Sequence, residues 1–367
     1  METLLPNVLP AGIRARMVPT GTGLTMHVLE AGYETPGRPC LLLLHGFPEL
    51  AYSWRKVMPA LAAAGYHVIA PDQRGYGLTR GWDAADLPSF RFINLVRDVL
   101  GLLAALGQTR VAAVVGHDFG ASIAAWAALI RPDIFRSAVL MSAPFAGPPA
   151  LATGKPTPDL HTALAALERP RKHYQWYYST DAANPDMHGA PQGVHDFLRA
   201  YYHNKSADWP GNQPFPLTGW TAEELAKLPT YYVMDRDLGM AATVAAEMPS
   251  AIPAWLPDAE LAVYADAYRR TGFQGGLNWY RCRTTPEIAS ELEVFADRAI
   301  EVPACFIAGA QDWGIHQSPG ALAAMQTKAC RRFLGVHLID GAGHWVQQEQ
   351  PDAVTRLLLA FFAQARV

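Results

Sequence analysis

Short apolar runs alternate with longer segments of helical spacing over the first 144 residues. Runs rich in Leu, Val, Ile and Ala are typical of strands buried on both faces of a parallel sheet. Between two such runs, apolar residues recur at helical intervals from Phe92 to Leu106, and Gly107 supplies a stop. The runs that we interpret as strands are 25–30, 40–44, 67–70, 111–115 and 137–141. This alternation predicts an α/β fold with a mostly parallel sheet.

The alternation fades after residue 144 and returns near residue 299. Residues 145–298 are rich in Trp, Tyr, Pro and Asn and show weaker periodicity. Beyond them, strand-like runs cover 302–308 and 336–340, and helical spacing covers 321–328 and 351–363. We therefore expect 1–144 and 299–367 to form one core, and 145–298 to form an inserted, mainly helical lid. A length of 367 residues suits a single α/β core with such an insertion.

Composition and charge exclude several classes of protein. Half of the residues are hydrophobic, 17% are charged and the net charge is −3, which favours a soluble globular protein. This balance gives no electrostatic footprint for nucleic acid or an anionic membrane. The N-terminus lacks a basic, apolar leader and no apolar run could span a membrane, so we expect a cytoplasmic protein. The four cysteines lack CxxC spacing, and we expect free thiols in a reducing compartment.

The most informative motif is Gly116-His-Asp-Phe-Gly120. An apolar run ends in it and an alanine-rich helical segment follows, which is the pattern of a nucleophile elbow with a carboxylate in the usual place of serine. Asp118 would attack a saturated carbon and become an ester itself. A helix cap is the other interpretation of Asp118, but the glycines on both sides favour the elbow. Ser122 also has small neighbours, yet it lies within the helical segment and is the weaker nucleophile candidate.

Two further residues follow predicted strands, Asp312 in Gly-Ala-Gln-Asp-Trp and His344 in Asp-Gly-Ala-Gly-His-Trp. Ligands of an open parallel sheet gather beyond the carboxyl ends of its strands, so we expect Asp118, Asp312 and His344 to meet there. The chain order of nucleophile, acid and histidine is that of an α/β-hydrolase. Asp312 alone could be a solvated loop residue, but its position relative to His344 favours an acid that orients the histidine.

Two loops after predicted strands supply supporting groups. Residues 45–49 follow one strand and could place the backbone N–H of Phe47, with that of Phe119, as an oxyanion hole. A second loop follows the next strand, and there we expect a fixed turn with an ion pair between Asp72 and Arg74.

Spacing suggests neither a metal site nor a nucleotide site. HxH and HExxH are absent around the four histidines that could be imagined as ligands, which are His45, His117, His316 and His344. GxGxxG and GxxxxGK are absent as well. We expect no metal and no cofactor, and we expect His117 to pack or to form hydrogen bonds beneath the elbow.

Several of these segments together resemble the soluble epoxide hydrolases of the α/β-hydrolase fold. The matching segments are 45–49, 72–77, 116–121, 341–345 and the lid segment 275–281. In that family two lid tyrosines polarise the epoxide oxygen, and the resemblance assigns these roles to Tyr280 and Tyr174. Tyr177 and Tyr178 could compete with Tyr174 for the second role. Phe119 departs from the family, which more often has tryptophan at this position.

The resemblance implies hydrolysis of an epoxide to a vicinal diol through an ester on Asp118. His344, oriented by Asp312, would activate the hydrolytic water. The implied partners are a small hydrophobic or aryl epoxide and water, with a homodimer as an option and no nucleic acid or membrane. The residues expected to line the substrate pocket are Phe47, Pro48, Phe119, Trp176, Trp279 and Trp345.

Two other functions are compatible with the same motifs. A dehalogenase can use the same three residues, but it needs tryptophan or similar N–H donors for the halide, whereas Phe119 follows Asp118 here and the lid offers tyrosines. A binding protein with the hydrolase fold but no turnover is the second, and the intact set of Asp118, Asp312 and His344 argues against it.

Overall fold

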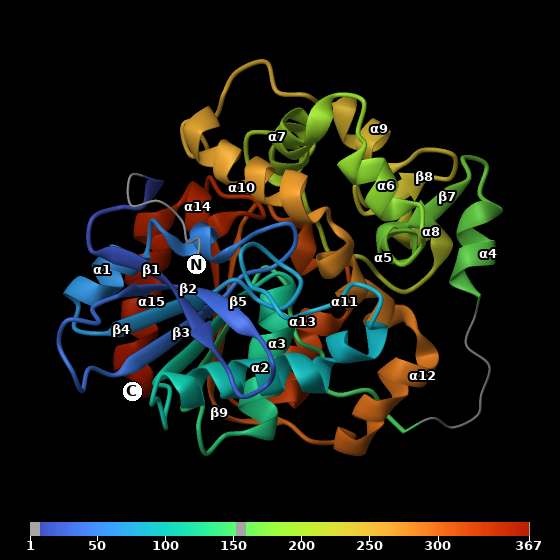
Figure 1. Ribbon diagram of the computed structural model, residues 1–367. Helices are drawn as coiled ribbons and strands as arrows, with labels where there is room; N and C mark the ends of the chain where they lie inside the picture. The colour runs from blue at the N-terminus through green and yellow to red at the C-terminus, as the bar shows by residue number, and fades with distance from the viewer. Residues whose placement is uncertain (1–7, 152–158, 367) are drawn as a thin grey trace.

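The computed structural model describes residues 8–151 and 159–366, and its centre is an eight-stranded sheet (Figure 1). The strands are β1 (Ile13–Pro19), β2 (Thr25–Ala31), β3 (Cys40–Leu44), β4 (His67–Pro71), β5 (Ala113–His117), β6 (Ala138–Met141), β9 (Ile300–Gly309) and β10 (Cys330–Ile339). Their order across the sheet is β1-β2-β4-β3-β5-β6-β9-β10. β2 pairs antiparallel with β1 and β4, whereas every pair from β4 to β10 is parallel. The mostly parallel sheet expected from the apolar runs is confirmed.

The two edge strands differ from the sequence prediction. The apolar pattern does not predict β1, because this strand is half-buried at the edge and contains Arg14 and Arg16. β10 begins at Cys330 rather than at 336, since its first half includes the exposed Arg331 and Arg332. Edge strands bury only part of their surface, so they lack the continuous apolar run of a central strand.

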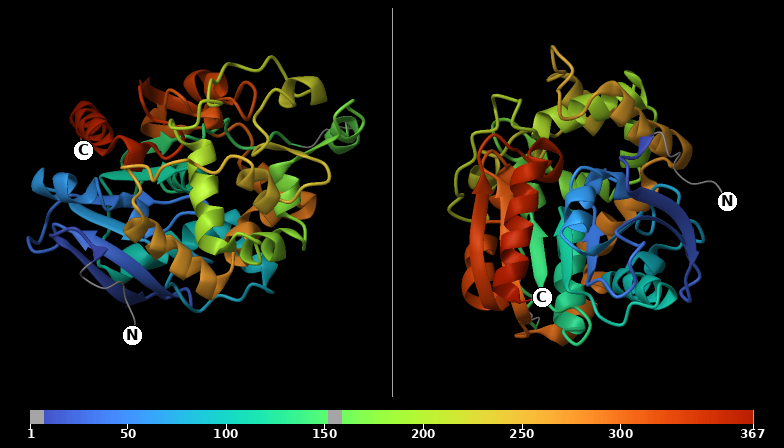
Figure 2. Two further views of the ribbon diagram at one scale, coloured as in Figure 1. Left: turned by 90° about the horizontal axis from the view of Figure 1, so that it is seen from above. Right: turned by 90° about the vertical axis from the view of Figure 1, so that its left-hand side faces the viewer.

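Helices cover both faces of the sheet (Figure 2). Alternate side chains of β3 point to opposite faces. Leu41 and Leu43 belong to the cluster on the side of α1 and α15, and Leu42 and Leu44 to the cluster on the side of α2 and α3. The bounds of these helices are α1 (Met58–Ala63), α2 (Phe92–Ala105), α3 (Phe119–Ile130) and α15 (Pro351–Ala365). The helical segment expected at 321–328 is present, beginning as α13 (Ala321–Ala324) and continuing as a π-helical turn, η6 (Met325–Ala329).

The described residues between β6 and β9 are mainly helical and lie at the top and right of Figure 1. The helices are α4 (Leu160–Ala165), α5 (Tyr174–Tyr178), α6 (Ala183–His188), α7 (Gly193–Lys205), α8 (Ala222–Leu225), α9 (Met240–Ala245), α10 (Asp258–Thr271), α11 (Gln274–Thr284) and α12 (Pro286–Ala289). A small antiparallel pair, β7 (Arg171–His173) and β8 (Val233–Asp235), accompanies them. Each of these two strands has only three residues, so neither produces a recognisable apolar run. The remaining helical turns are η2 (Ala51–Trp54), η3 (Leu87–Phe90), η4 (Ser290–Phe295), η5 (Trp313–Ile315) and α14 (Val346–Glu349).

The loop after β4 corrects one expectation from the sequence, because Asp72 and Arg74 do not pair with each other. Asp72 points towards β2, where its Oδ2 lies 2.8 Å from His27 Nδ1, and its Oδ1 accepts the N–H of Ala51 at 2.9 Å. Arg74 points towards α2 and binds both carboxylate oxygens of Asp98 at 2.6 and 2.8 Å. The turn directs the two side chains to different layers, and each therefore ties the loop to a separate element.

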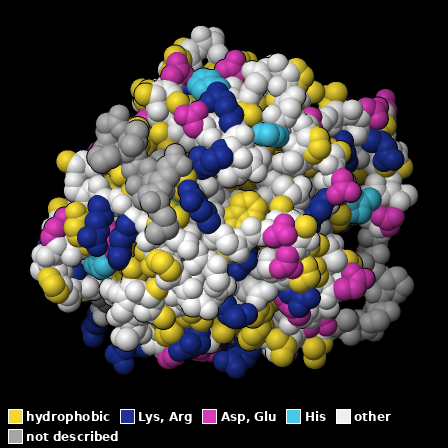
Figure 3. Space-filling view, in the orientation of Figure 1, with side chains coloured by type: hydrophobic (Ala, Val, Ile, Leu, Met, Phe, Trp, Pro, Cys, Tyr) yellow, Lys and Arg dark blue, Asp and Glu magenta, His cyan; other side chains and the backbone are white. Residues whose placement is uncertain are grey.

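All four cysteines are buried free thiols. Burial raises the pKa of Cys40, Cys282 and Cys330 to about 12, so these thiols stay protonated and unreactive at neutral pH. Within residues 8–151 and 159–366, no helix is long and apolar enough to cross a membrane. Basic and acidic side chains both occur across the face drawn in Figure 3.

Candidate active site

The elbow is a tight crossing between β5 and α3. Asp118 stands between the two elements with φ 54° and ψ −120°, a left-handed conformation that costs a non-glycine residue of order 1–3 kcal/mol. A Cβ on Gly116 would lie 2.1 Å from the carbonyl oxygen of Gly120, and a Cβ on Gly120 would lie 2.3 Å from that of Leu44. Both positions therefore require glycine. The Asp118 side chain makes no capping hydrogen bond to α3, which rules out the helix-cap interpretation.

The Asp118 carboxylate has a different partner for each oxygen. Its Oδ1 accepts the backbone N–H of Phe47 at 3.0 Å, and its Oδ2 lies 3.2 Å from His344 Nε2. Burial alone would raise the pKa of Asp118, but the contact with His344 and the positive charge of Lys205 hold it well below its usual range. The carboxylate is therefore ionised at neutral pH, and the Phe47 N–H fixes the position of its Oδ1.

His344 is fully buried between two carboxylates. Its Nδ1 lies 3.1 Å from both carboxylate oxygens of Asp312, and Asp312 Oδ1 also accepts the N–H of Gly314 at 2.6 Å. Burial alone would lower the pKa of His344, but Asp312 and Asp118 together raise it to about 9. The imidazole therefore carries a proton at neutral pH while Asp118 is charged.

Tyr174 and Tyr280 come from α5 and α11 and line the same small cavity as Asp118. Its volume is about 40 Å³, and the other lining residues are Phe119, Ser122, Ala143, Pro144, Gln175, Arg283, Gln317 and Ser318. The Tyr174 hydroxyl donates to Gln317 Oε1 at 2.9 Å. The Tyr280 hydroxyl has no hydrogen-bond partner among the described residues. Burial and the charge of Asp118 raise the pKa of both phenols, so both stay protonated.

The two neighbouring tyrosines of α5 have their hydroxyl groups engaged elsewhere. Tyr177 donates to Asp186 at 2.8 Å, and Tyr178 donates to the hydroxyl of Tyr201 at 3.0 Å. Neither lines the cavity at Asp118. The geometry thus favours Tyr174 over both as the partner of Tyr280.

Five of the six expected pocket residues do not line the cavity at Asp118, and Phe119 is the one that does. The other five are packed where lid and core meet, or within the lid. Trp279 Nε1 donates to the Arg74 carbonyl and Trp345 Nε1 to the Tyr202 carbonyl, while the Trp176 ring lies 4.2 Å from that of His161. The ring of Phe47 packs against that of Tyr280 at 5.6 Å, and the Pro48 carbonyl accepts the hydroxyl of Tyr202. Aromatic composition alone does not tell which faces are packed and which are open.

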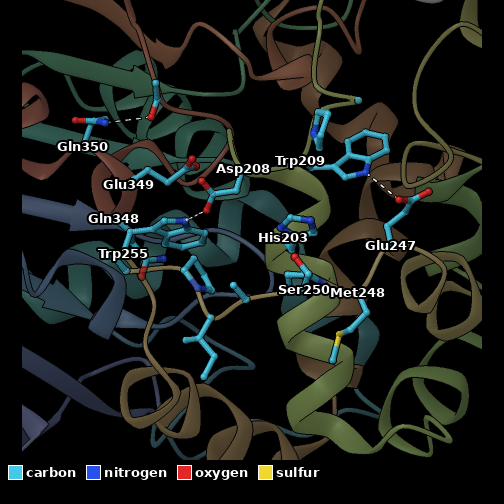
Figure 4. Close-up of a pocket in the computed structure, with 18 of the residues that line it drawn as sticks. His203, Asp208, Trp209, Glu247, Met248, Ser250, Trp255, Gln348, Glu349 and Gln350 are labelled. Carbon is cyan, nitrogen blue, oxygen red and sulfur yellow. Dashed lines mark hydrogen bonds between the residues drawn. The ribbon is translucent and has the colours of Figure 1, made fainter.

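Of two larger hollows in the described residues, one adjoins the site. A groove of about 720 Å³ shares Ser122, Pro144, Arg283 and Ser318 with the small cavity. Its wall is largely apolar and includes Phe92, Trp126, Phe145 and Trp220. A second hollow, of about 1100 Å³, contains none of the candidate catalytic side chains (Figure 4). The groove therefore provides the space adjoining Asp118.

Several contacts around the site could not be predicted from the sequence. His117 lies beneath the elbow as expected, but its partners come from distant segments, namely Glu49 at 2.6 Å and the His344 carbonyl at 2.7 Å. Lys205 and Gln317 belong to no motif. Lys205 reaches the site through the packing of lid on core, and Gln317 follows the Asp312 loop of the core and accepts the hydroxyl of the lid residue Tyr174. Across the described residues, no three His, Cys, Asp or Glu side chains are arranged to hold a metal ion.

Comparison with known proteins agrees with this geometry. A family model described as the α/β-hydrolase fold matches residues 39–351. Epoxide hydrolase A of Mycobacterium tuberculosis is 35% identical over 354 residues, which is 94% of this chain and 96% of the relative. An epoxide hydrolase of Caballeronia sordidicola is 31% identical and covers 92% of this chain and 91% of its own length.

Solved structures give the same result. An epoxide hydrolase from an endophytic Streptomyces superposes with a TM-score of 0.79 at 31% identity, covering 97% of both chains. Potato epoxide hydrolase I superposes with a TM-score of 0.73 at 30% identity and covers 96% of this chain and 99% of its own. These likenesses, which extend over nearly the whole chain, favour epoxides over halides and turnover over mere binding. The chain therefore belongs to the epoxide hydrolases of the α/β-hydrolase fold and is an enzyme that hydrolyses epoxides.

Proposed function

We propose that the enzyme opens its epoxide by attack of Asp118 and then hydrolyses the resulting ester with His344. The observation that carries this proposal is the meeting of four groups at one cavity. Asp118 lines it together with Tyr174 and Tyr280, and His344 Nε2 lies 3.2 Å from the Asp118 carboxylate. A nucleophile, a base and two protonated phenols are the groups that this two-step reaction requires.

In the first step Asp118 Oδ2 forms a bond to a ring carbon. The Phe47 N–H holds Oδ1, so this oxygen becomes the ester carbonyl. The electron pair of the broken C–O bond goes to the epoxide oxygen, which takes a proton from the Tyr280 phenol while Tyr174 donates a hydrogen bond. Tyr280 is the better proton donor because its hydroxyl is not engaged by any described residue. The product of this step is a hydroxyalkyl ester and a tyrosinate.

In the second step His344 becomes a base. Esterification removes the charge of Asp118, which is one of the two charges that raise the pKa of the imidazole. The proton of His344 replaces the one that the phenol gave, and Nε2 then takes a proton from a water that attacks the Asp118 carbonyl carbon. The N–H groups of Phe47 and Phe119 would hold the oxyanion. The diol oxygen leaves with the proton from His344, and the new carboxylic acid passes its proton back to the imidazole.

The groove beside Asp118 supports a substrate with an apolar body. The cavity at the nucleophile, about 40 Å³, has room for little more than the epoxide ring, whereas the adjoining groove of about 720 Å³ is lined by Phe92, Trp126, Phe145 and Trp220. Burial of apolar surface contributes roughly 25 cal/mol per Å² to binding before the costs of association. We therefore propose aryl or long alkyl epoxides as the substrate class.

The variant His344→Gln tests the covalent step. It should form the ester but hydrolyse it at least about a hundredfold more slowly than the natural enzyme, because general-base catalysis is lost. Intact mass spectrometry after mixing with styrene oxide should show one added substrate mass, located on the peptide that contains Asp118.

A single turnover of the natural enzyme in heavy-oxygen water provides the complementary measurement. The diol should carry unlabelled oxygen taken from Asp118, and the label should enter the carboxylate. Label found directly in the diol, together with no adduct on His344→Gln, would overturn the covalent mechanism.

A further inference from the structure

Lys205 has a buried ammonium group without a counter-ion. It is the last residue of α7, and its side chain belongs to the buried set at 3% exposure. Within the described part of the chain, Nζ makes neither a hydrogen bond nor an ion pair. Nζ lies near four tyrosine rings, with distances to the ring centroids of 4.6 Å for Tyr232, 5.2 Å for Tyr201, 5.6 Å for Tyr231 and 5.7 Å for Tyr174.

Burying this charge costs free energy, because the ammonium group leaves water without gaining a carboxylate partner. Cation–π contacts with the four surrounding rings offset only part of this cost. Burial lowers the pKa of Lys205 to about 8, although the charges of Asp118 and Asp312 act to raise it. A methionine side chain has a similar length and could fill the same space without this cost, so a role for the charge explains the lysine better than packing does.

The main chain of Lys205 is attached directly to the loop of the catalytic histidine. The His344 N–H donates to the Lys205 carbonyl at 2.8 Å. A Cβ on Gly343 would lie 2.5 Å from the same carbonyl oxygen, which shows how closely α7 approaches this loop. The backbone of Lys205 is thus held against the histidine loop, and the four tyrosine rings surround its ammonium group.

In the second reaction step, the charges around His344 decide whether its imidazole carries a proton, and Lys205 is one of these charges. The proposed mechanism needs His344 without its proton while Asp118 is an ester. Asp312, 3.1 Å from Nδ1, still favours the protonated imidazole at that stage. The positive charge of Lys205 acts in the opposite direction and lowers the pKa of His344. Without Lys205, burial would be the main influence that opposes the effect of Asp312 on the pKa of His344.

We propose that Lys205 is a positioning residue for ester hydrolysis, whose carbonyl fixes the His344 loop and whose ammonium charge favours the unprotonated imidazole. This inference rests on the covalent mechanism proposed above. The ionisable groups around the Lys205 ammonium are Tyr174, Tyr201, Tyr231 and Tyr232. Those around the His344 imidazole are Asp118, Asp312 and His117, and His117 in turn contacts Glu49.

Single-turnover kinetics of Lys205→Met and Lys205→Arg test this role, with ester formation and ester hydrolysis followed separately by rapid quenching. In Lys205→Met, the pH at which hydrolysis is half-maximal should rise by about one unit, and hydrolysis on the acid side should fall about tenfold. Ester formation should change far less. Lys205→Arg keeps the charge and should retain the natural pH profile of hydrolysis.

Lys56→Met is the matched control, because Lys56 is a partly buried lysine that bonds to the Trp255 carbonyl away from Asp118. It removes the same charge and should leave both steps unchanged. An unshifted pH profile in Lys205→Met, or equal loss in Lys205→Met and Lys205→Arg, would overturn the role of the charge. Should Lys205→Met not fold, as judged by circular dichroism, Lys205→Gln replaces it under the same criteria. If the natural enzyme forms no ester, the covalent mechanism itself is wrong. This result is distinct from those that support or overturn the role of the Lys205 charge.

Discussion

Of the two lid phenols that line the cavity at Asp118, Tyr280 is the one whose hydroxyl has no described hydrogen-bond partner. It lines the cavity at Asp118, whereas the hydroxyl of Tyr174 already donates to Gln317. An unengaged donor can turn to the epoxide oxygen without breaking a bond, so the loss of Tyr280 should affect ring opening more than the loss of Tyr174.

We therefore expect Tyr280→Phe to slow ester formation about a hundredfold, since a general acid contributes on that order, and to leave ester hydrolysis within a few fold. The measurement is the rate of each step in a single turnover. Tyr177→Phe is the control, because the Tyr177 hydroxyl bonds to Asp186 away from the cavity. Equal losses in both variants would assign Tyr280 a structural role only.

Local geometry decides which parts of this site could be predicted from the sequence. Gly116 and Gly120 flank Asp118 because neither position has room for a Cβ, and this requirement is visible in the sequence as a motif. Lys205 reaches the site only through the packing of lid on core, which leaves no local pattern. Trp279 shows the converse case, since an aromatic residue in a matching lid segment packs against the core and does not line the cavity at Asp118.

At the scale of elements, Glu349 at the end of α14 joins the lid to the histidine loop. Its carboxylate accepts the N–H groups of Gly343 at 3.0 Å and Trp345 at 2.9 Å, on either side of His344. It also accepts the N–H of Ala207, which follows α7, at 2.8 Å. Three backbone donors thus converge on one side chain beside the hollow in Figure 4.

Glu349→Gln should destabilise the protein by about 1–3 kcal/mol and reduce turnover, because the amide group turns a donor towards backbone N–H groups. Urea unfolding and steady-state rates provide the two measurements. Glu247 lies on the same hollow and accepts one bond, from Trp209 Nε1 at 3.1 Å. Glu247→Gln should change stability by no more than about 0.5 kcal/mol, and an equal effect of both variants would contradict the role of Glu349.

The elements follow the apolar pattern where they are buried and depart from it where they are not. β3 occupies the range expected from its run of leucines, because it is covered on both faces. β1, β7 and β8 escape prediction since exposure or shortness removes the apolar signal. The sequence therefore specifies the centre of the sheet better than its edges and its lid.

For the molecule as a whole, buried carboxylates near the antiparallel edge of the sheet contribute to the response to acid. Burial alone would raise the pKa of Asp72, but His27 and backbone N–H groups lower it from 3.8 to about 2. Burial likewise opposes the charge of Glu30, yet His67, Arg16 and Arg14 lower its pKa from 4.5 to about 2. Because the folded pKa values lie below the unfolded ones, this stabilisation is present above pH 4.5 and is lost as the pH falls towards 2.

The free energy of unfolding falls between pH 4.5 and pH 2, and Asp72→Asn should make this fall smaller by about 2 kcal/mol. The variant should also be less stable at neutral pH. Urea unfolding at several pH values measures the slope. Asp83→Asn, at an exposed position, should retain the natural slope. A slope in Asp72→Asn as steep as in the natural protein would show that other groups govern the acid response.

The attachment of α7 to the histidine loop limits how this enzyme can be recombined with its relatives. A chimera that exchanges only the lid would join a foreign α7 end to the native His344 loop. The bond from His344 N–H to the Lys205 carbonyl and the bond from Ala207 N–H to Glu349 both cross that junction. Residues 341–349 should therefore be inherited together with the lid, although the elements from β9 to β10 separate the two in the chain. Libraries that exchange the lid and residues 341–349 together would vary the substrate range and keep the bond between His344 and the carbonyl at the end of α7.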